Sequence, residues 1–292
     1  VVADRLSFPA KEYCFHGEDF MEPELWMPFV EPAVLRPGPE RVANHPFPKW
    51  RGDRRELLRV FEMWARAGRF SVRPAAGVPV AEVSQLGAVA KTADEDRHIL
   101  DERGPNGLED KLRGPSAHLP DASKFFDLHL EKNQNMIVST KDLRHYYHQF
   151  VVSAAHAHRT PVGTPMRGSE LAHIPGCSDL SPDLNYYGCY AGLGMGDHGA
   201  VEWGLAAHEE ILSQAGILTP GRWLRGDAPT PGGDVAVAVI IDDLVIAEKV
   251  TVKTPPISPD LLKAAEVGYE KADCEGSPEK DLSARPTVPL QG

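Results

Sequence analysis

Apolar residues recur at helical spacing in three segments of the chain. In residues 56–68, four apolar side chains fall on one helical face and a glycine closes the segment, so the pattern predicts an amphipathic helix. The four side chains are Leu57, Val60, Phe61 and Trp64. Helices are also expected over 197–214, which Gly216 would terminate, and over 259–271, where a proline stands at the start.

Runs of β-branched and other apolar residues predict the strands. The expected strands are a pair within 80–103 around a polar turn at 92–96, and single strands at 136–140, 150–152, 235–241 and 244–247. Helices and strands follow one another without regular alternation. This arrangement favours the α+β fold class over a doubly wound parallel sheet.

Composition and charge exclude several classes of protein. The 292 residues carry 31 basic and 42 acidic side chains, a net charge of −11, which argues against a general nucleic-acid coat protein. Residues 51–69 are a local exception with six arginines against three acids, and a solvated helix face is the simpler interpretation. No apolar run reaches the roughly 20 residues of a membrane span, and the four cysteines form no C-x-x-C pair. We therefore expect an intracellular protein, cytoplasmic or nuclear, in a reducing compartment.

Two adjacent carboxylates stand between the last two expected strands. Asp242 and Asp243 would repel each other at a tightly held turn unless a positive group lies beside them, and Mg²⁺ prefers such oxygen ligands. Taken alone, an Asp-Asp pair is also an ordinary turn dipeptide. Asp142 follows the strand expected at 136–140. If that strand neighbours 235–241, the acids could share two metal ions of the kind that serve phosphoryl transfer.

Five segments together carry a more specific resemblance. They are Arg97–Asn106, which reads R-x-x-x-D-x-R-x-x-N; His118–Pro120; Asp142–Phe150, which reads D-L-x-x-x-Y-H-Q-F; Leu193–Ala200; and Ile240–Asp243. In this order they resemble the fingers and palm motifs of reverse transcriptases from LTR-type retroelement Pol polyproteins. The matches run from about Ala88 to Leu282. The chain departs from the family pattern at Ile240, where an aromatic residue is usual, and at Gly194, where proline is usual.

The resemblance implies a right-hand polymerase fold with an antiparallel palm sheet packed on helices. It assigns residues 1–50 to a Pro-rich N-terminal arm or linker and 51–125 to the first part of the fingers. Residues 126–292 would form the palm, with a fingers insertion at about 153–185. Thumb and RNase H domains are expected to be absent, since no clear primer-grip segment follows Lys280.

The resemblance also implies a catalytic group. Asp142 and Asp242 would be the main ligands of two Mg²⁺ (or Mn²⁺) ions, with Asp243 beside them. The ions would activate the 3′-hydroxyl of the primer and neutralise the leaving pyrophosphate. Lys280 resembles the late palm lysine that can donate a proton to pyrophosphate; a plain surface lysine is the alternative.

A second group would bind the nucleotide. Lys91 and Arg97 would hold the triphosphate, because guanidinium geometry suits phosphate oxygens. Tyr147 falls where the family places a ring beneath the sugar, and Gly196 and Gly199 would let the backbone approach nucleotide and template. The alternatives are an exposed hairpin charge for Arg97, a core tyrosine for Tyr147 and ordinary turn glycines.

The implied function is RNA-directed DNA polymerisation, with a primed RNA or DNA template and dNTP as partners and no membrane. Other Pol domains are possible partners as well. Two alternatives stay open: a degenerate, non-catalytic relic that binds nucleic acid or a partner, and a metal-dependent nuclease built on the same acids. Asp101 and Arg103 are expected to form a structural ion pair rather than to act in catalysis.

Overall fold

The computed structural model describes residues 1–38 and 52–286, and in it the chain forms two compact units. Within these limits, unit 1 comprises Val1–Glu18, Pro23–Leu112 and Tyr147–Ala200, and unit 2 comprises Asp19–Glu22, Arg113–Tyr146 and the residues from Val201 onward. Each unit is therefore assembled from separated segments of the chain. The division into arm, fingers and palm is a functional one and stays a prediction.

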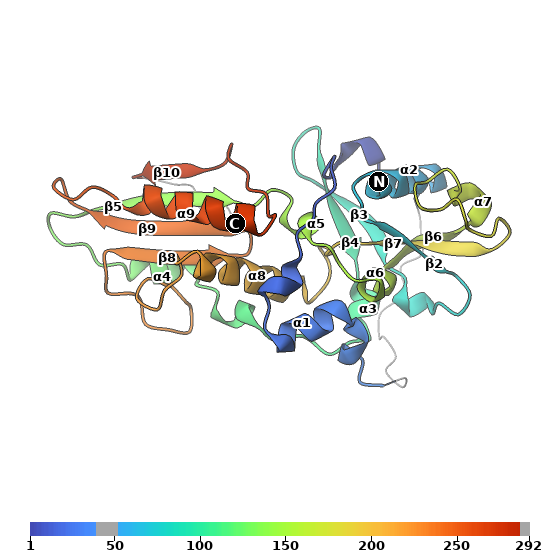
Figure 1. Ribbon diagram of the computed structural model, residues 1–292, viewed down its shortest axis with the longest axis horizontal. Coiled ribbons are helices and arrows are strands. Elements are labelled where there is room, and N and C mark those ends of the chain that lie inside the picture. The colour runs from blue at the N-terminus through green and yellow to red at the C-terminus, as the bar shows by residue number, and fades with distance from the viewer. Residues whose placement is uncertain (39–51, 287–292) are drawn as a thin grey trace. The chain divides into compact units, whose positions relative to one another are not determined.

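Unit 1 holds two three-stranded sheets surrounded by short helices (Figure 1). The sheets run in the orders β1-β4-β3 and β2-β7-β6, with β1 (Leu6–Ser7), β2 (Phe70–Pro74), β3 (Gln85–Ala90), β4 (Asp96–Asp101), β6 (Pro161–Arg167) and β7 (Asn185–Tyr190). The α-helices are α1 (Pro23–Val30), α2 (Arg54–Arg66), α3 (Arg103–Gly107), α5 (Tyr146–Gln149), α6 (Ala154–Arg159) and α7 (Gly168–Leu171). The 3-10 helices are η1 (Ala3–Arg5), η2 (Gly17–Phe20), η3 (Pro32–Leu35) and η4 (Val80–Glu82). Tyr146 at the start of α5, and Asp19 and Phe20 in η2, belong to unit 2.

Helix α2 supplies the core of unit 1 as its apolar spacing predicts. Leu57, Val60, Phe61 and Trp64 are all buried in one cluster. The side chain of Asp53 accepts a hydrogen bond from the Arg55 amide and so caps the first turn. Gly68 follows the helix with φ +67°, a conformation that favours glycine at a helix end.

The hairpin expected within 80–103 forms as strands β3 and β4. Their register pairs Leu86 with Leu100, and both side chains are buried on the same face. The intervening turn closes where the Lys91 amide donates to the Glu95 carbonyl, at 2.8 Å. The predicted hairpin is therefore confirmed, and its opposite face carries the exposed positions.

The strand expected at 150–152 is wrong. Phe150 forms only an isolated parallel bridge with Phe15, and the two rings pack with centroids 4.7 Å apart. Helix α5 ends just before this segment and Ser153 caps α6 just after it, so no room is left for a strand. The bridge also ties the expected N-terminal arm to unit 1, which contains residues 1–18 and 23–38. Residues 39–50 of that arm lie outside the described residues.

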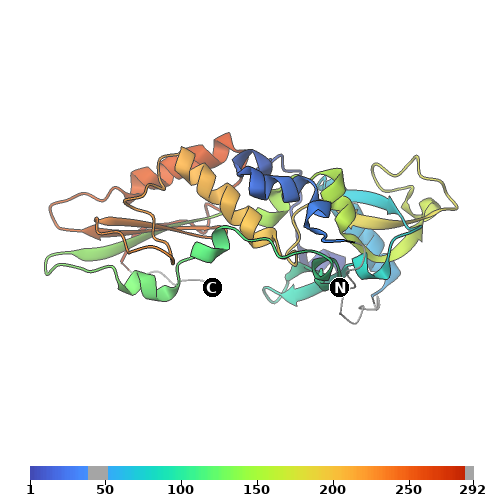
Figure 2. The same ribbon diagram turned by 90° about the horizontal axis from the view of Figure 1, so that it is seen from below.

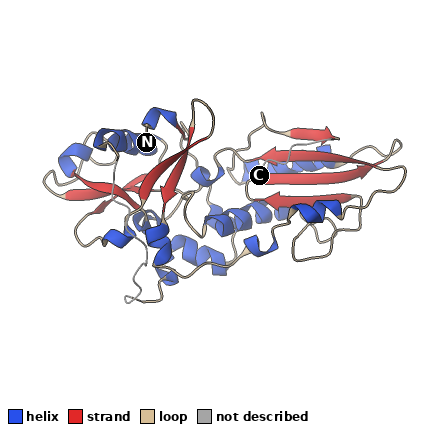
Figure 3. Ribbon diagram, turned by 180° about the vertical axis from the view of Figure 1, so that it is seen from behind, coloured by secondary structure: helices blue, strands red, loops and turns tan. Residues whose placement is uncertain are grey.

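Unit 2 is a single antiparallel sheet with helices on both faces (Figures 1 and 3). The strand order is β10-β5-β9-β8, with β5 (Asn135–Asp142), β8 (Val235–Ile240), β9 (Asp243–Val250) and β10 (Leu282–Arg285). The helices are η5 (Pro115–His118), α4 (Ala122–Phe126), α8 (Ala200–Gln214), whose first residue belongs to unit 1, and α9 (Ser258–Lys271). The expected strands at 136–140, 235–241 and 244–247 and the expected helices at 197–214 and 259–271 are thus confirmed, with small shifts at their ends.

The two faces of this sheet are buried by different elements. Helices α8 and α9 lie along one face and α4 lies on the other, as the view from below shows (Figure 2). On the α4 face, Ala236, Ala238, Val245 and Ala247 pack with Leu128 and Leu224. The residues that alternate with them are buried on the opposite face, which α8 and α9 cover; they are Val237, Val239, Leu244 and Ile246. Burial on both faces explains the near-continuous apolar run that predicts β8.

Within residues 1–38 and 52–286, every helix is too short or too polar to cross a membrane.

Candidate functional site

The strand register of unit 2 places the predicted acids together. Asp142, at the end of β5, is the cross-strand partner of Asp243, at the start of β9. Such partners share one face of the sheet with their Cβ atoms about 5 Å apart. Asp242 precedes Asp243 in the two-residue β8–β9 connection, and its carbonyl accepts a hydrogen bond from the Leu143 amide at 3.1 Å. Asp142 and the adjacent pair Asp242 and Asp243, about 100 positions later in the sequence, therefore meet where β5 ends and β9 begins.

Burial and the neighbouring acids both disfavour the ionised form of Asp243. Its side chain is half-buried, and burial, followed by the negative charges of Asp242 and Asp142, raises its pKa to about 6. Lys280 acts in the opposite direction and lowers this pKa. The site thus carries more negative charge than one lysine balances.

Lys280 reaches the acids because the chain returns along them after α9. Gly276 bridges to Leu143, and the Ser277 amide donates to the Asp142 carbonyl at 2.7 Å. A turn then directs the Lys280 Nζ to both carboxylate oxygens of Asp142, at 2.9 and 2.8 Å. The structure thus places Lys280 beside Asp142, and its predicted role as a proton donor stays a prediction.

The donor set fits a divalent cation although a ready-made site is not present. Among residues 1–38 and 52–286, no three His, Cys, Asp or Glu side chains stand arranged around a common point that could hold a metal ion. Asp142 is turned to Lys280 instead. Three neighbouring carboxylates are nonetheless the ligand type that Mg²⁺ prefers, and the charges of Asp242 and Asp142 add to burial in raising the pKa of Asp243.

The residues predicted to hold the triphosphate lie in unit 1, at one end of the β1-β4-β3 sheet. Arg97 on β4 is exposed and pairs in register with Val89 and with Ser7. Lys91 follows β3, and its Nζ lies 2.8 Å from the Ser7 hydroxyl and 3.1 Å from Glu95. Because alternate residues share a face, Lys91 and Arg97 project from the same exposed face. The structure thus brings these two cations together.

The glycine-containing turn at 193–199 is held tightly against β4 and α3. A Cβ on Gly196 would stand 1.8 Å from the Leu100 carbonyl oxygen, so only glycine fits. Asn106 donates to the Gly196 carbonyl at 2.7 Å, and the Gly199 amide donates to Asp197, also at 2.7 Å. The predicted fingers segment and the predicted turn are therefore neighbours.

Tyr147 lies in α5 and is half-buried. Its carbonyl accepts a hydrogen bond from the Leu193 amide at 3.3 Å, which fixes the backbone of Tyr147 beside the same turn. Asp101 and Arg103 form the expected ion pair, with the Arg103 Nη2 2.6 Å from the Asp101 carboxylate.

A buried ion cluster beneath this turn is a feature that sequence patterns did not reveal. The guanidinium of Arg159, at the end of α6, contacts three buried carboxylates, those of Glu102, Glu109 and Asp197, at 2.6 to 2.9 Å. Burial raises the pKa of Glu102 to about 8, while Arg159 holds the pKa of Asp197 below its ordinary value against the effect of burial. These residues come from three separate segments, around 102–109, 159 and 197, so no local pattern could have indicated the cluster.

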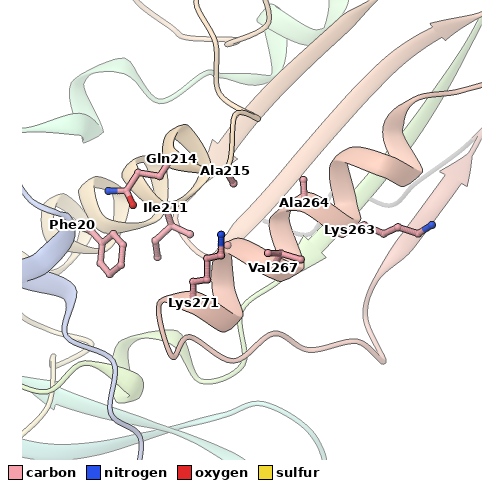
Figure 4. Close-up of a pocket in the computed structure, with 9 residues that line it drawn as sticks. Phe20, Ile211, Gln214, Ala215, Lys263, Ala264, Val267 and Lys271 are labelled. Atoms are coloured by element: carbon pink, nitrogen blue, oxygen red, sulfur yellow. The ribbon is translucent and has the colours of Figure 1, made fainter.

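The predicted site residues fall into two groups, one in each unit. Unit 2 holds Asp142, Asp242, Asp243 and Lys280, and unit 1 holds Lys91, Arg97, Tyr147, Gly196 and Gly199. Unit 2 also has a groove of about 500 Å³ between α8 and α9, lined by Ile211, Val267 and Lys271 among others (Figure 4). None of the predicted site residues lines this groove.

Comparison with known proteins finds solved structures with a similar fold but no matching sequence family. No protein-family model matches this sequence, and no curated protein does either. The structure of the foamy viral protease-reverse transcriptase dRH in complex with double-stranded DNA is similar, with a TM-score of 0.53, 14% identity, and coverage of 88% of this chain and 38% of that chain. The foamy viral protease-reverse transcriptase in complex with double-stranded DNA gives a TM-score of 0.50 at 14% identity, covering 86% and 43% of the two chains. The present chain thus has a reverse transcriptase-like fold and spans less than half the length of these chains.

The raised pKa of Asp243 gives a test of the acid cluster. An unfolded aspartate titrates near pH 4, well below the folded value of about 6. The unfolded state therefore loses this proton first as pH rises, so the contribution of Asp243 to stability is present below about pH 4 and lost through about pH 6. In metal-free buffer, Asp243→Asn should melt above the wild type at about pH 8, and the two melting temperatures should converge near about pH 4.

The matched control is Asp183→Asn at an exposed loop position outside the acid cluster, which should melt close to the wild type. Parallel stability curves for Asp243→Asn and the wild type would show that the pKa of Asp243 is not raised.

Proposed function

We propose that this chain is the fingers and palm segment of an RNA-directed DNA polymerase from a retroelement Pol polyprotein. The observation that carries the proposal is the cross-strand pairing of Asp142 with Asp243, with Asp242 in the adjoining turn. The same residues carry the D-L-x-x-x-Y-H-Q-F and x-x-D-D motifs. The reverse transcriptase-like fold supports the proposal.

In this proposal Asp142, Asp242 and Asp243 hold two Mg²⁺ (or Mn²⁺) ions. When bound, such ions lower the pKa of a primer 3′-hydroxyl and neutralise charge on the reacting phosphate. The three carboxylates bind the ions and keep their own positions through the sheet register. Because Asp142 and Asp243 lie on paired strands and Asp242 lies in the two-residue turn next to them, little backbone freedom has to be lost on binding.

Lys280 has two roles in the proposal. Before ions bind, its ammonium group balances the charge of Asp142. Once the carboxylate is otherwise engaged, the released Nζ can donate one proton to the leaving pyrophosphate oxygen and regain a proton from water. The lysine is half-exposed, so this exchange with solvent is open to it.

Unit 1 supplies the nucleotide-binding residues in the proposal. Lys91 and Arg97 share an exposed face and would bind the triphosphate of a dNTP. Tyr147 would lie beneath the sugar, where a ring excludes a 2′-hydroxyl. Gly196 and Gly199 would let the backbone approach nucleotide and template strand. A primed RNA or DNA template and other Pol domains are the proposed partners, because this chain matches only part of the longer enzymes.

Extension of a DNA primer on an RNA template tests the proposal. With Mg²⁺ or Mn²⁺ and dNTP, and with a thumb domain supplied in the same chain, the wild type should add nucleotides. Asp242→Asn should lower the rate by at least about 10³-fold, as loss of a charge-stabilising catalytic group does. Asp183→Asn is the matched control and should retain the wild-type rate.

Absence of extension together with measurable Mn²⁺ binding would contradict polymerisation and favour the non-catalytic relic. Cleavage of the template without dNTP, abolished by Asp242→Asn, would favour the nuclease instead.

Substitution of Lys280 separates its two roles. In Lys280→Ala the Asp142 carboxylate has no competing ammonium group, so Mn²⁺ should bind more tightly, by about three- to tenfold for an exposed pair. The rate of primer extension at saturating metal should instead fall, by about 10²-fold for loss of a general acid. Titration of Mn²⁺ by calorimetry and single-turnover extension measure the two effects. A change of both quantities in the same direction would contradict one of the two roles.

A further inference from the structure

The connection that carries Asp242 is conformationally strained. It consists of Ile241 and Asp242 only, because Ile240 and Asp243 are already paired across β8 and β9. Ile241 has φ +59°, in the left-handed region that a β-branched residue rarely adopts. Such a conformation persists only where surrounding contacts impose it.

One contact that imposes it comes from His208 in the middle of α8. The His208 Nδ1 lies 2.8 Å from the Ile241 carbonyl oxygen, and its Nε2 lies 2.8 Å from the hydroxyl of Tyr269 in α9. A carbonyl can only accept, so Nδ1 carries the proton and donates it. The Nε2 is then the acceptor, and the Tyr269 hydroxyl donates to it. Both hydrogen bonds are therefore fixed in direction.

Burial makes this arrangement rigid. His208 has no exposed surface and Tyr269 is 3% exposed. The rings lie 5.5 Å apart, centroid to centroid. Burial also lowers the pKa of His208 to about 4, so the imidazole is neutral in neutral solution and keeps the single tautomer described above. Helices α8 and α9 are thus joined to the strained peptide by one chain of hydrogen bonds.

We infer that His208, oriented by Tyr269, is a positioning residue that holds the Ile241–Asp242 turn in the conformation that presents Asp242 beside Asp142. The inference rests on the proposed function for its catalytic consequence. Its structural content is independent of that function, since it concerns the turn itself. Neither residue touches the acids in this role; both act through the Ile241 carbonyl.

Tyr146 provides a matched control for the loss of a buried hydrogen bond. It is also 3% exposed, and its hydroxyl donates to the Gly204 carbonyl in α8 at 2.8 Å. Its ring packs near His208, with centroids 5.9 Å apart. Tyr146→Phe therefore removes a hydrogen bond in the same part of the unit without removing the contact to Ile241.

The experiment compares His208→Leu, His208→Asn, Tyr269→Phe and Tyr146→Phe with the wild type in the full chain. Asparagine keeps an N–H donor near the position of Nδ1 and loses the partner of Tyr269. Hydrogen–deuterium exchange is followed at the Leu143 amide, which donates to the Asp242 carbonyl, and through the turn at 240–243. Mn²⁺ affinity is measured on the same samples, and the kcat and KM of primer extension are measured on the same variants with the thumb domain supplied in the same chain.

In His208→Leu, exchange at the turn should rise about tenfold, as expected for loss of a net stabilising hydrogen bond. Exchange in the distant part of the hairpin, at 235–237 and 246–249, should stay at the wild-type rate. His208→Asn should recover most of the protection, and Tyr269→Phe should show an intermediate loss. Mn²⁺ affinity and kcat should fall with the loss of protection, while KM for dNTP should change little. Tyr146→Phe should lower the melting temperature without raising exchange at the turn.

Turn exchange in Tyr269→Phe equal to that of the wild type would overturn the inference, and this mild change keeps it testable if His208→Leu does not fold. So would a rise of the same size in Tyr146→Phe. If the turn responds as expected but the wild type neither binds Mn²⁺ nor extends a primer, the positioning of the turn stands and the proposed function fails.

Discussion

The antiparallel pairing of β5 with β9 is the constraint on which the rest of the site depends. Its register sets Asp142 opposite Asp243 and brings Asp242 alongside, against the repulsion of three negative charges. Apolar side chains buried on both faces of the sheet hold that register, because a shift by one residue would move every one of them to the opposite face. The fold thus holds three carboxylates close together where β5 ends and β9 begins, and a bound cation would reduce the repulsion between them.

Two other features follow from this constraint. The chain after α9 returns along β5 and delivers Lys280 to Asp142, which supplies part of the missing positive charge. The hairpin must also turn within two residues, which forces Ile241 into a strained conformation that His208 and Tyr269 hold from the helix layer. The sheet sets the acids, the returning segment balances them, and the helices stabilise the turn between them.

Local apolar patterns and ordered motifs in the sequence predicted several of the helices and strands and the candidate acids. The features that depend on packing between distant segments appeared only in the structure. The spacing of apolar residues predicts α2, the β3–β4 hairpin, α8 and α9, because each buries a face defined within a few residues. The two strand-plus-aspartate segments indicated the acid cluster only on the condition that 136–140 neighbours 235–241. In the structure β5 pairs instead with β9, which lies between β5 and β8 and still brings the acids together. The β2-β7-β6 sheet and the Arg159 cluster could not be predicted, since their partners are far apart in sequence. The wrong strand at 150–152 shows the limit of a short apolar run, because Phe150 is buried by packing against Phe15 and Phe29 rather than by pairing in a sheet.

Anomalous scattering of Mn²⁺ in crystals of this chain tests most directly whether the three aspartates bind divalent metal ions. We expect Mn²⁺ peaks coordinated by the carboxylates of Asp142 and Asp242, with Asp243 beside them and with Lys280 displaced from Asp142. A map without Mn²⁺ at these carboxylates, at a concentration that saturates known two-metal sites, and with Lys280 still paired to Asp142, would contradict it.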